Sequence, residues 1–164
     1  MTGRIRQNEL LNRQQESQLS SLLKLTQQLV GAREIGQIAR IAVAHFSKAF
    51  GAGVCLYLAE EGRAMPVTPH RASSYRPGEK EYGVATWVFL NRKAAGKFTH
   101  TLAGVDAQFL PVATERGNYG VRGIDLGKVK TLPFDQEALL AGSIQQVATA
   151  IERVRLIENA GPAE

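Results

Sequence analysis

Apolar and polar residues alternate with a helical period at both ends of the chain, and short apolar runs lie between the two ends. Residues 8–30 contain neither Gly nor Pro and are rich in Gln, Leu, Glu and Arg, so they predict one long helix. Its leucines form one stripe, interrupted by polar Gln15 and Gln18; they are Leu11, Leu22, Leu25 and Leu29. The stripe is typical of a coiled coil with polar layers, but an ordinary amphipathic helix packed on its own domain shows the same pattern.

The last segment of the chain has the strongest periodicity. From Phe134 onward, apolar residues advance in alternating steps of four and three, as in the a/d seam of a coiled coil: Leu140, Ile144, Val147, Ile151 and Val154. Asp135 and Glu137 favour the start of a helix, and Gly161-Pro162 favours its end. Because about 25 helical residues span roughly 40 Å, more than a small domain needs, we expect this helix to project or to pair.

Two more helices are predicted between these ends. Residues 34–50 repeat apolar positions near the 3.6-residue period, and Gly51 ends the pattern. His45 lies on this apolar stripe, where a histidine is more often a core residue than a ligand or a base. Residues 79–91 predict the other helix, whose apolar face holds Val84, Trp87 and Val88.

Short apolar runs predict the strands of a sheet. Val54–Leu58 predicts a central strand, and the Glu60-Glu61-Gly62 turn predicts a hairpin to a partner strand at residues 63–68. Further strands are expected at 98–102, 108–114 and 119–126, the last two joined by a turn at Arg116-Gly117-Asn118. No strand–helix–strand alternation requires a parallel sheet, so the pattern favours an antiparallel α+β fold.

Composition narrows the class of protein. With 164 residues, 44% of them apolar, the chain can bury one core. The longest stretch without a charged residue, 138–151, is shorter than the roughly 20 apolar residues of a membrane span. No apolar block follows Arg4 and Arg6, so a secretory signal is not expected. A single cysteine, Cys55, excludes an internal disulfide and is expected to be a buried apolar residue. We therefore expect a reducing, cytoplasmic compartment.

The net charge of +5 is concentrated in one basic segment. Residues 63–97 hold seven lysines and arginines against two glutamates, and the remainder of the chain is neutral. The segment could face an anion or an acidic partner, or its charges could simply be solvated, and the sequence leaves both interpretations open.

Few residues suggest chemistry. His45, His70 and His100 are scattered, and with Cys55 alone they do not form a zinc site or a redox pair. No nucleophile motif is found, and the glycines of the segment 117–123 are expected in turns and bulges. The most suggestive local feature is a candidate small-molecule pocket formed by Trp87, Gly96, Thr99, His100 and Thr101. A helix cap and turn, with Trp87 in the core, would explain the same residues.

A family resemblance runs through this region. The matching residues are Trp87, Phe89, Ala95, Gly96, Thr99, Thr101, Leu102 and Pro111, followed by Tyr119-Gly120-Val121 and Ile151-Glu152-Arg153. On these motifs, residues 25–157 resemble the GAF domain of the KdpD-type potassium-responsive sensor histidine kinases. The resemblance implies a GAF-like antiparallel sheet of about five or six strands flanked by helices, with long terminal signalling helices. Residues 1–30 would be the first signalling helix, 31–132 the core, 133–160 the second signalling helix and 161–164 a tail.

The same resemblance implies a function. The chain would be a regulatory domain that couples a membrane sensor to the kinase core of the same parent protein and thereby controls potassium-transport genes. No histidine box is found, so the chain itself is not expected to phosphorylate anything. A homodimer is expected through a helical seam consisting of Leu22, Leu25, Leu29, Leu140, Ile144, Val147, Ile151 and Val154. A small-molecule ligand is possible, but no cofactor follows, because the Asn-Lys-Phe-Asp-Glu signature of cyclic-nucleotide GAF domains is missing.

Two other functions compete with this one. The basic segment 63–97 could bind nucleic acid or an anionic ligand, using the interleaved Tyr75, Tyr82, Trp87 and Phe98. The helical period places Trp87 inward, which argues against base stacking, so no nucleic acid is expected. A methionine-sulfoxide-reducing GAF enzyme normally relies on several cysteines, and only Cys55 is present.

Overall fold

The computed structural model of the chain describes residues 2–60 and 62–160, without the side chains of residues 2–7, 11, 14 and 15. Some predicted features therefore lie outside the description: the side chains of Leu11 and Gln15, residue Glu61, and the proposed tail 161–164 with Gly161-Pro162. The described part forms four helices and one sheet of four strands. In chain order they are α1 (Thr2–Gly31), α2 (Ile35–Phe50), β1 (Val54–Leu58), α3 (Glu79–Asn91), β2 (Ala95–Gly96), β3 (Ala107–Ala113), β4 (Asn118–Asp125) and α4 (Phe134–Ala160).

All four predicted helices are confirmed, and local signals fix their ends. Glu34 and Gln37 form a capping box at the start of α2, and Gly51 ends α2 with a left-handed backbone (φ 59°). Arg92 ends α3 in the same conformation (φ 53°). α1 is a single helix that begins closer to the amino terminus than predicted.

The sheet is antiparallel, as predicted, but its order and strand number differ from the prediction. The strand order is β1-β4-β3-β2, so the described residues form four strands rather than five or six. β3 and β4 form the predicted hairpin, with an irregularity between Val112 and Ala113. Val54–Leu58 is an edge strand rather than a central one, because it pairs only with β4.

The predicted partner strand at residues 63–68 is wrong. That segment is irregular, and the loop after it satisfies the outer edge of β1 instead. Ser73 Oγ accepts from Leu56 N and Ser74 Oγ accepts from Val54 N, each at 3.0 Å, while His70 N donates to Leu56 O at 2.7 Å. Because these bonds occupy the edge groups of β1, no strand is needed there.

The predicted strand at residues 98–102 is also wrong. Phe98 (φ 64°) and Leu102 (φ 51°) have left-handed backbones, which strands do not contain. The short strand β2 lies just before this segment, and Gly96 (φ 98°) turns the chain after it. Residues 97–106 are therefore turns that return the chain to β3.

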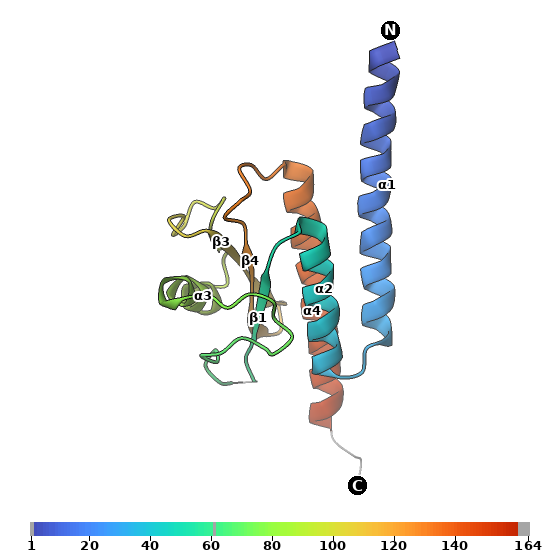
Figure 1. The fold of residues 1–164 in the computed structure, drawn as a ribbon. Coiled ribbons are helices and arrows are strands. Elements are labelled where there is room, and N and C mark those ends of the chain that lie inside the picture. The colour runs from blue at the N-terminus through green and yellow to red at the C-terminus, as the bar shows by residue number, and fades with distance from the viewer. Residues whose placement is uncertain (1, 61, 161–164) are drawn as a thin grey trace.

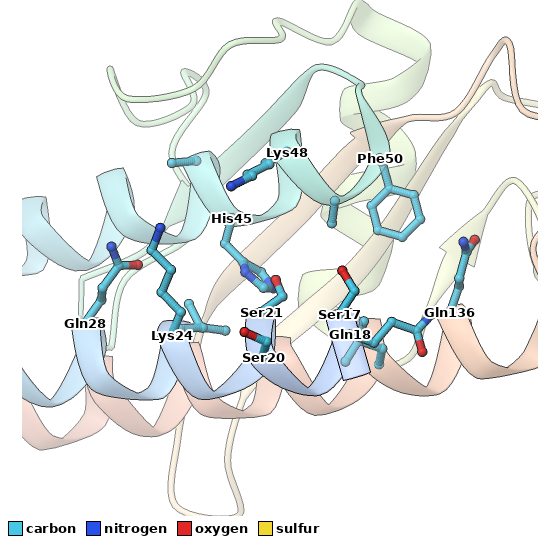
Figure 2. Close-up of a pocket in the computed structure, with 14 residues that line it drawn as sticks. Ser17, Gln18, Ser20, Ser21, Lys24, Gln28, His45, Lys48, Phe50 and Gln136 are labelled. Carbon is cyan, nitrogen blue, oxygen red and sulfur yellow. The ribbon is translucent and has the colours of Figure 1, made fainter. Parts of the chain in front are cut away.

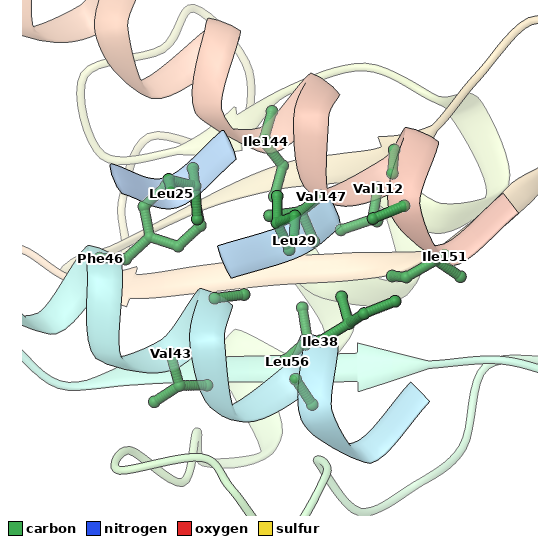
Figure 3. Close-up of a cluster of buried hydrophobic side chains, with 14 of the residues drawn as sticks. Leu25, Leu29, Ile38, Val43, Phe46, Leu56, Val112, Ile144, Val147 and Ile151 are labelled. Atoms are coloured by element: carbon green, nitrogen blue, oxygen red, sulfur yellow. The ribbon is translucent and has the colours of Figure 1, made fainter. Parts of the chain in front are cut away.

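The sheet is covered on both faces (Figure 1). α2 and α4 lie on one face with α1 packed against their outer side, and these three helices form the helical layer. α3 lies on the other face of the sheet. The larger core lies between the sheet and the helical layer, with side chains from all three helices and from β1, β3 and β4 (Figure 3). The smaller core lies under α3 and includes Cys55, which is fully buried as predicted. α1 and α4 run in the same direction, and α1 extends beyond the globule at its amino-terminal end (Figure 1).

Candidate functional site

Three residues of the predicted pocket are joined by hydrogen bonds in one turn. Thr99 Oγ1 lies 2.8 Å from both Gly96 O and Thr101 O, and Gly96 N donates to Thr101 O at 2.9 Å. His100 is exposed beside this turn, whereas Trp87 is half-buried on α3 against the smaller core. The structure thus brings Gly96, Thr99 and Thr101 together, and their hydrogen bonds serve the turn itself.

A groove lies instead within the helical layer, between α1, α2 and the start of α4 (Figure 2). Its volume is about 620 Å³, within the usual range of small-molecule sites. Hydroxyl, amide and cationic side chains line most of it, over a partly apolar floor. The lining residues are Ser17, Gln18, Ser20, Ser21, Lys24, Leu25, Gln28, Ala44, His45, Lys48, Ala49, Phe50, Gln136 and Leu139.

His45 connects this groove to the interior. Its Nε2 atom lies 3.2 Å from Oγ of the buried Ser143 on α4, and its ring meets Phe46 edge-on at 5.2 Å. Burial lowers the pKa of His45, so the neutral imidazole is favoured. The histidine is satisfied by a core neighbour, as the sequence predicted, and also borders the groove.

The residues of the predicted helical seam lie inside the chain's own core. Seven of the eight are buried and Leu22 is half-buried, and they pack between α1, α4, α2 and the sheet (Figure 3). The buried seven are Leu25, Leu29, Leu140, Ile144, Val147, Ile151 and Val154. The heptad-like spacing therefore corresponds to packing within one chain, and a second copy would have to displace α1 or α4 to use these side chains.

Polar contacts join α1 directly to α4. Thr26 Oγ1 donates to Gln146 Oε1 at 2.7 Å in the middle of the pair. Nearer the end of α1, the Arg153 guanidinium donates from Nη2 to Leu29 O at 2.8 Å and to Ala32 O at 3.0 Å. The last carbonyls of a helix lack partners within it, so Arg153 caps α1 from the neighbouring helix. Nothing in local sequence spacing indicates this pairing.

The same stretch of α4 is also bonded to the sheet. Glu152 accepts hydrogen bonds from Tyr119 Oη at 2.6 Å and from Thr114 Oγ1, and these bonds lower the pKa of Glu152. Arg155 Nη1 donates to Ala59 O at 2.5 Å, just beyond the end of β1. Residues 152–155 of α4 therefore connect α1, the β3–β4 hairpin and β1.

One buried charge lies between the sheet and the helices. Arg122 on β4 is fully buried, and its closest polar partner is Gln108 Oε1, 3.4 Å from Nη2. Its Nε and Nη1 atoms have no hydrogen-bond partner among the described residues, and Phe46 lies under the guanidinium at 4.9 Å. Burial lowers the pKa of Arg122 to about 9. Sequence reasoning missed this residue, because an arginine in a strand normally predicts a solvent-facing position.

The aromatic residues of the nucleic-acid alternative are packed rather than displayed. Tyr75, Tyr82 and Trp87 pack against the smaller core, and Tyr82 Oη donates to Pro66 O at 3.2 Å. Phe98 packs against the larger core beneath Lys97. These rings do not form the exposed stacking platform that single-stranded nucleic acid requires.

Within residues 2–60 and 62–160, no helix combines the length and the apolar character needed to cross a bilayer. No group of three or more His, Cys, Asp or Glu side chains in this part of the chain could hold a metal ion.

Comparison with known proteins first defines the class of fold. No family model matches the chain. The structure aligns with the native GAF domain of the potassium sensor histidine kinase KdpD from Escherichia coli, with a TM-score of 0.73 and 26% identity over 85% of this chain and 96% of that one. It also aligns with the GAF domain of an Acinetobacter phosphoenolpyruvate-protein phosphotransferase, with a TM-score of 0.64 over 87% and 98% of the two chains, where 15% identity shows the fold alone. The described part of the chain therefore has the GAF fold.

The amino-acid sequence is also similar to that of a sensor protein. The sensor protein KdpD of Escherichia coli (strain K12) is 27% identical over 158 residues, which are 95% of this chain and 17% of KdpD. The chain is therefore similar in sequence and in fold to the GAF domain of KdpD, and it spans about one sixth of the length of this curated relative.

Proposed function

We propose that this chain is the regulatory domain of a KdpD-type sensor histidine kinase, located on the cytoplasmic side of the cell membrane. It receives a signal from an upstream sensor segment through α1 and passes it to a downstream kinase through α4. In this role it contributes to potassium-dependent gene control without performing phosphotransfer itself. The similarity to KdpD supports the class of parent protein, and the helical layer supports the route of the signal.

The observation that carries this proposal is the direct connection between the two terminal helices. α1 and α4 lie side by side in the same direction, and Arg153 joins the end of α1 to α4. A displacement of α1 along its axis must therefore move α4 or break these bonds. Regulation then follows from a shift between two arrangements of the helical layer, each favoured by a different state of the sensor.

A chimera tests the coupling. Residues 1–164 would replace the corresponding segment of Escherichia coli KdpD, and autophosphorylation would be measured at low and high potassium. We expect the chimera to keep a potassium-dependent response and Arg153→Gln to reduce that response, because the variant loses the charged cap on α1. Arg33→Gln, an exposed arginine close to the same helix end, is the matched control. An Arg153→Gln chimera that folds and responds like the parent would contradict the proposed route.

We also propose a homodimer, formed by the outer face of α1 rather than by the buried seam. Leu19, Leu23 and Val30 are 58%, 55% and 69% exposed and recur at steps of four and seven residues. These steps place the three side chains on one face, as a parallel helix pair requires. The second copy is the natural occupant, because it presents the same exposed stripe on its own α1 and the two stripes can cover each other.

Light scattering at increasing protein concentration tests the dimer. Replacing Leu19, Leu23 and Val30 together by Ser should shift the population to the monomer without lowering thermal stability, because these side chains contribute little to the chain's own core. Leu90→Ser, at a 73% exposed position on α3, should leave the dimer intact. A parent chain that is monomeric at all concentrations, or a triple variant that dimerises unchanged, would exclude this interface.

A further inference from the structure

The groove between α1, α2 and α4 has a one-sided charge that the proposed signalling role does not use. Among the described residues, its lining includes Lys24 and Lys48 but no aspartate or glutamate. Glu16, Asp135 and Glu137 are sequence neighbours of lining residues but do not line the groove themselves. The groove therefore offers hydrogen-bond donors and positive charge to a ligand, and none of its described lining side chains is a carboxylate that would repel an anion.

The two lysines face the same space from different helices. Figure 2 shows Lys24 rising from α1 and Lys48 reaching from α2, with His45 and Ser21 between the two helices. In the described part of the chain, neither ammonium group forms an ion pair or a hydrogen bond. No described acidic side chain pairs with either lysine, so both positive charges are available to attract a bound anion.

We propose that this groove binds a small molecule carrying a phosphate group, with Lys24 and Lys48 as its charged contacts. Serine hydroxyls at 17, 20 and 21 supply further donors along α1. Lysine binds phosphate as a point charge, and a phosphate group carries a charge of about −1.5 to −2 at pH 7, so two lysines match it better than they match a single carboxylate. The apolar floor at Leu25, Phe50 and Leu139 can accept the remainder of the ligand.

This site is separate from the basic segment 63–97. That segment lies in the loop after β1, in α3 and in the turn after β2, whereas the groove belongs to the opposite, helical layer. The two positions can therefore be tested independently in one protein. The binding proposal also does not depend on the signalling role, because it concerns only what the groove holds.

A titration with inorganic pyrophosphate tests the proposal. The ¹⁵N-labelled chain would be titrated at constant ionic strength while its amide spectrum is recorded. We expect saturable shifts at amides of residues 17–28 and 44–50, and a dissociation constant raised roughly threefold to tenfold by Lys24→Gln and again by Lys48→Gln. Both lysines are exposed, so these variants should keep the dispersed spectrum of the folded chain. Lys93→Gln, an exposed lysine in the basic segment, is the matched control and should bind like the parent.

Three results would overturn the proposal. Shifts that do not saturate, or that remain unchanged in the Lys24→Gln, Lys48→Gln double variant, would show that the groove is not the site. Shifts centred on residues 63–97 and reduced by Lys93→Gln would assign anion binding to the basic segment instead. Equal saturable shifts with acetate at the same concentration would contradict the preference for phosphate over a single carboxylate.

Discussion

The buried guanidinium of Arg122 destabilises the fold at neutral pH, and removing it should stabilise the protein. A pKa lowered from 12.5 to about 9 corresponds to roughly 5 kcal/mol against the charged form. Relaxation reduces this cost in real proteins, and replacing buried ionic groups by apolar ones of similar volume is neutral or stabilising by about 1–4 kcal/mol. The contacts in place offset little, because the Gln108 hydrogen bond is long at 3.4 Å and the Phe46 ring contributes about 0.5–2 kcal/mol.

The perturbation is the double variant Arg122→Met, Gln108→Leu. Met retains most of the apolar stem volume of the arginine, and Leu prevents the buried Gln108 amide from losing its partner, which would cost about 1–3 kcal/mol. We expect the double variant to raise the free energy of unfolding by about 1–3 kcal/mol, and the melting temperature by roughly 2–12 °C for a chain of this size. Arg122→Met alone should gain less.

Urea unfolding at pH 7 measures the effect, with an unchanged dependence on urea concentration as the sign of a common unfolded state. The pH dependence supplies a second check. Because the pKa of Arg122 is lower in the folded state, the unfolded state binds more protons above about pH 9, so the parent gains stability there relative to the variant. The difference between the two proteins should therefore shrink between pH 9 and pH 10.5. A double variant that is less stable by more than about 1 kcal/mol would refute the reasoning, because it would show that Arg122 is well satisfied in the fold.

Leu25→Ala should lower the free energy of unfolding, measured in denaturant, by about 2–5 kcal/mol, because Leu25 is buried in the larger core. Leu23→Ala, at an exposed position, should change it by less than about 0.5 kcal/mol. Equal losses in the two variants would place the leucine stripe outside the core. Gly120→Ala should lower the free energy of unfolding by about 3 kcal/mol or more, because φ is +155° and a Cβ there would overlap Tyr57 O. Gly104→Ala, at a position in open space, should leave it nearly unchanged. A Gly120→Ala protein as stable as the parent would contradict the backbone conformation at Gly120. The pKa of His45 is lowered in the folded state, so the unfolded state takes up a proton first and the parent loses thermal stability below about pH 6.5. His45→Gln should reduce this loss, whereas His100→Gln, at an exposed position, should not. Identical pH profiles for the parent and both variants would contradict a buried, neutral His45.

The helices could be predicted from the sequence because their signals are local. The 3.6-residue period, Gly51 after α2 and the acidic first turn of α3 act within a few residues, so the predicted ends agree with the structure to within about one residue at α2 and α3. The sheet depends on distant partners. β1 pairs with β4, more than 60 residues later in the chain, and no local pattern distinguishes this pairing from a hairpin with residues 63–68. The turn at Phe98 and Leu102 was also hidden, because non-glycine residues rarely adopt a left-handed backbone.

The groove could not be predicted for a related reason. Ser17, Ser20 and Lys24 have the composition of a solvent-facing helix surface, and they become a site only because α2 and α4 pack beside them. The leucine stripe shows the opposite case. Its period correctly identified which face of α1 is apolar, but the same period fits a core within one chain and a seam between two chains, so it could not name the partner.

The position of the polar bonds suggests how the two proposals are related. Arg153 holds the carboxyl-terminal end of α1 and Gln146 holds Thr26, whereas the groove extends along α1 from Gln28 back to Ser17. A ligand in the groove would therefore move the part of α1 before Lys24 more than the held part from Thr26 to the helix end. The held end would then act as a pivot, so that binding in the groove changes the direction in which the outer stripe of Leu19 and Leu23 meets a second copy. In such an arrangement the bond from Arg153 determines whether α4 rotates with α1 or remains with the sheet.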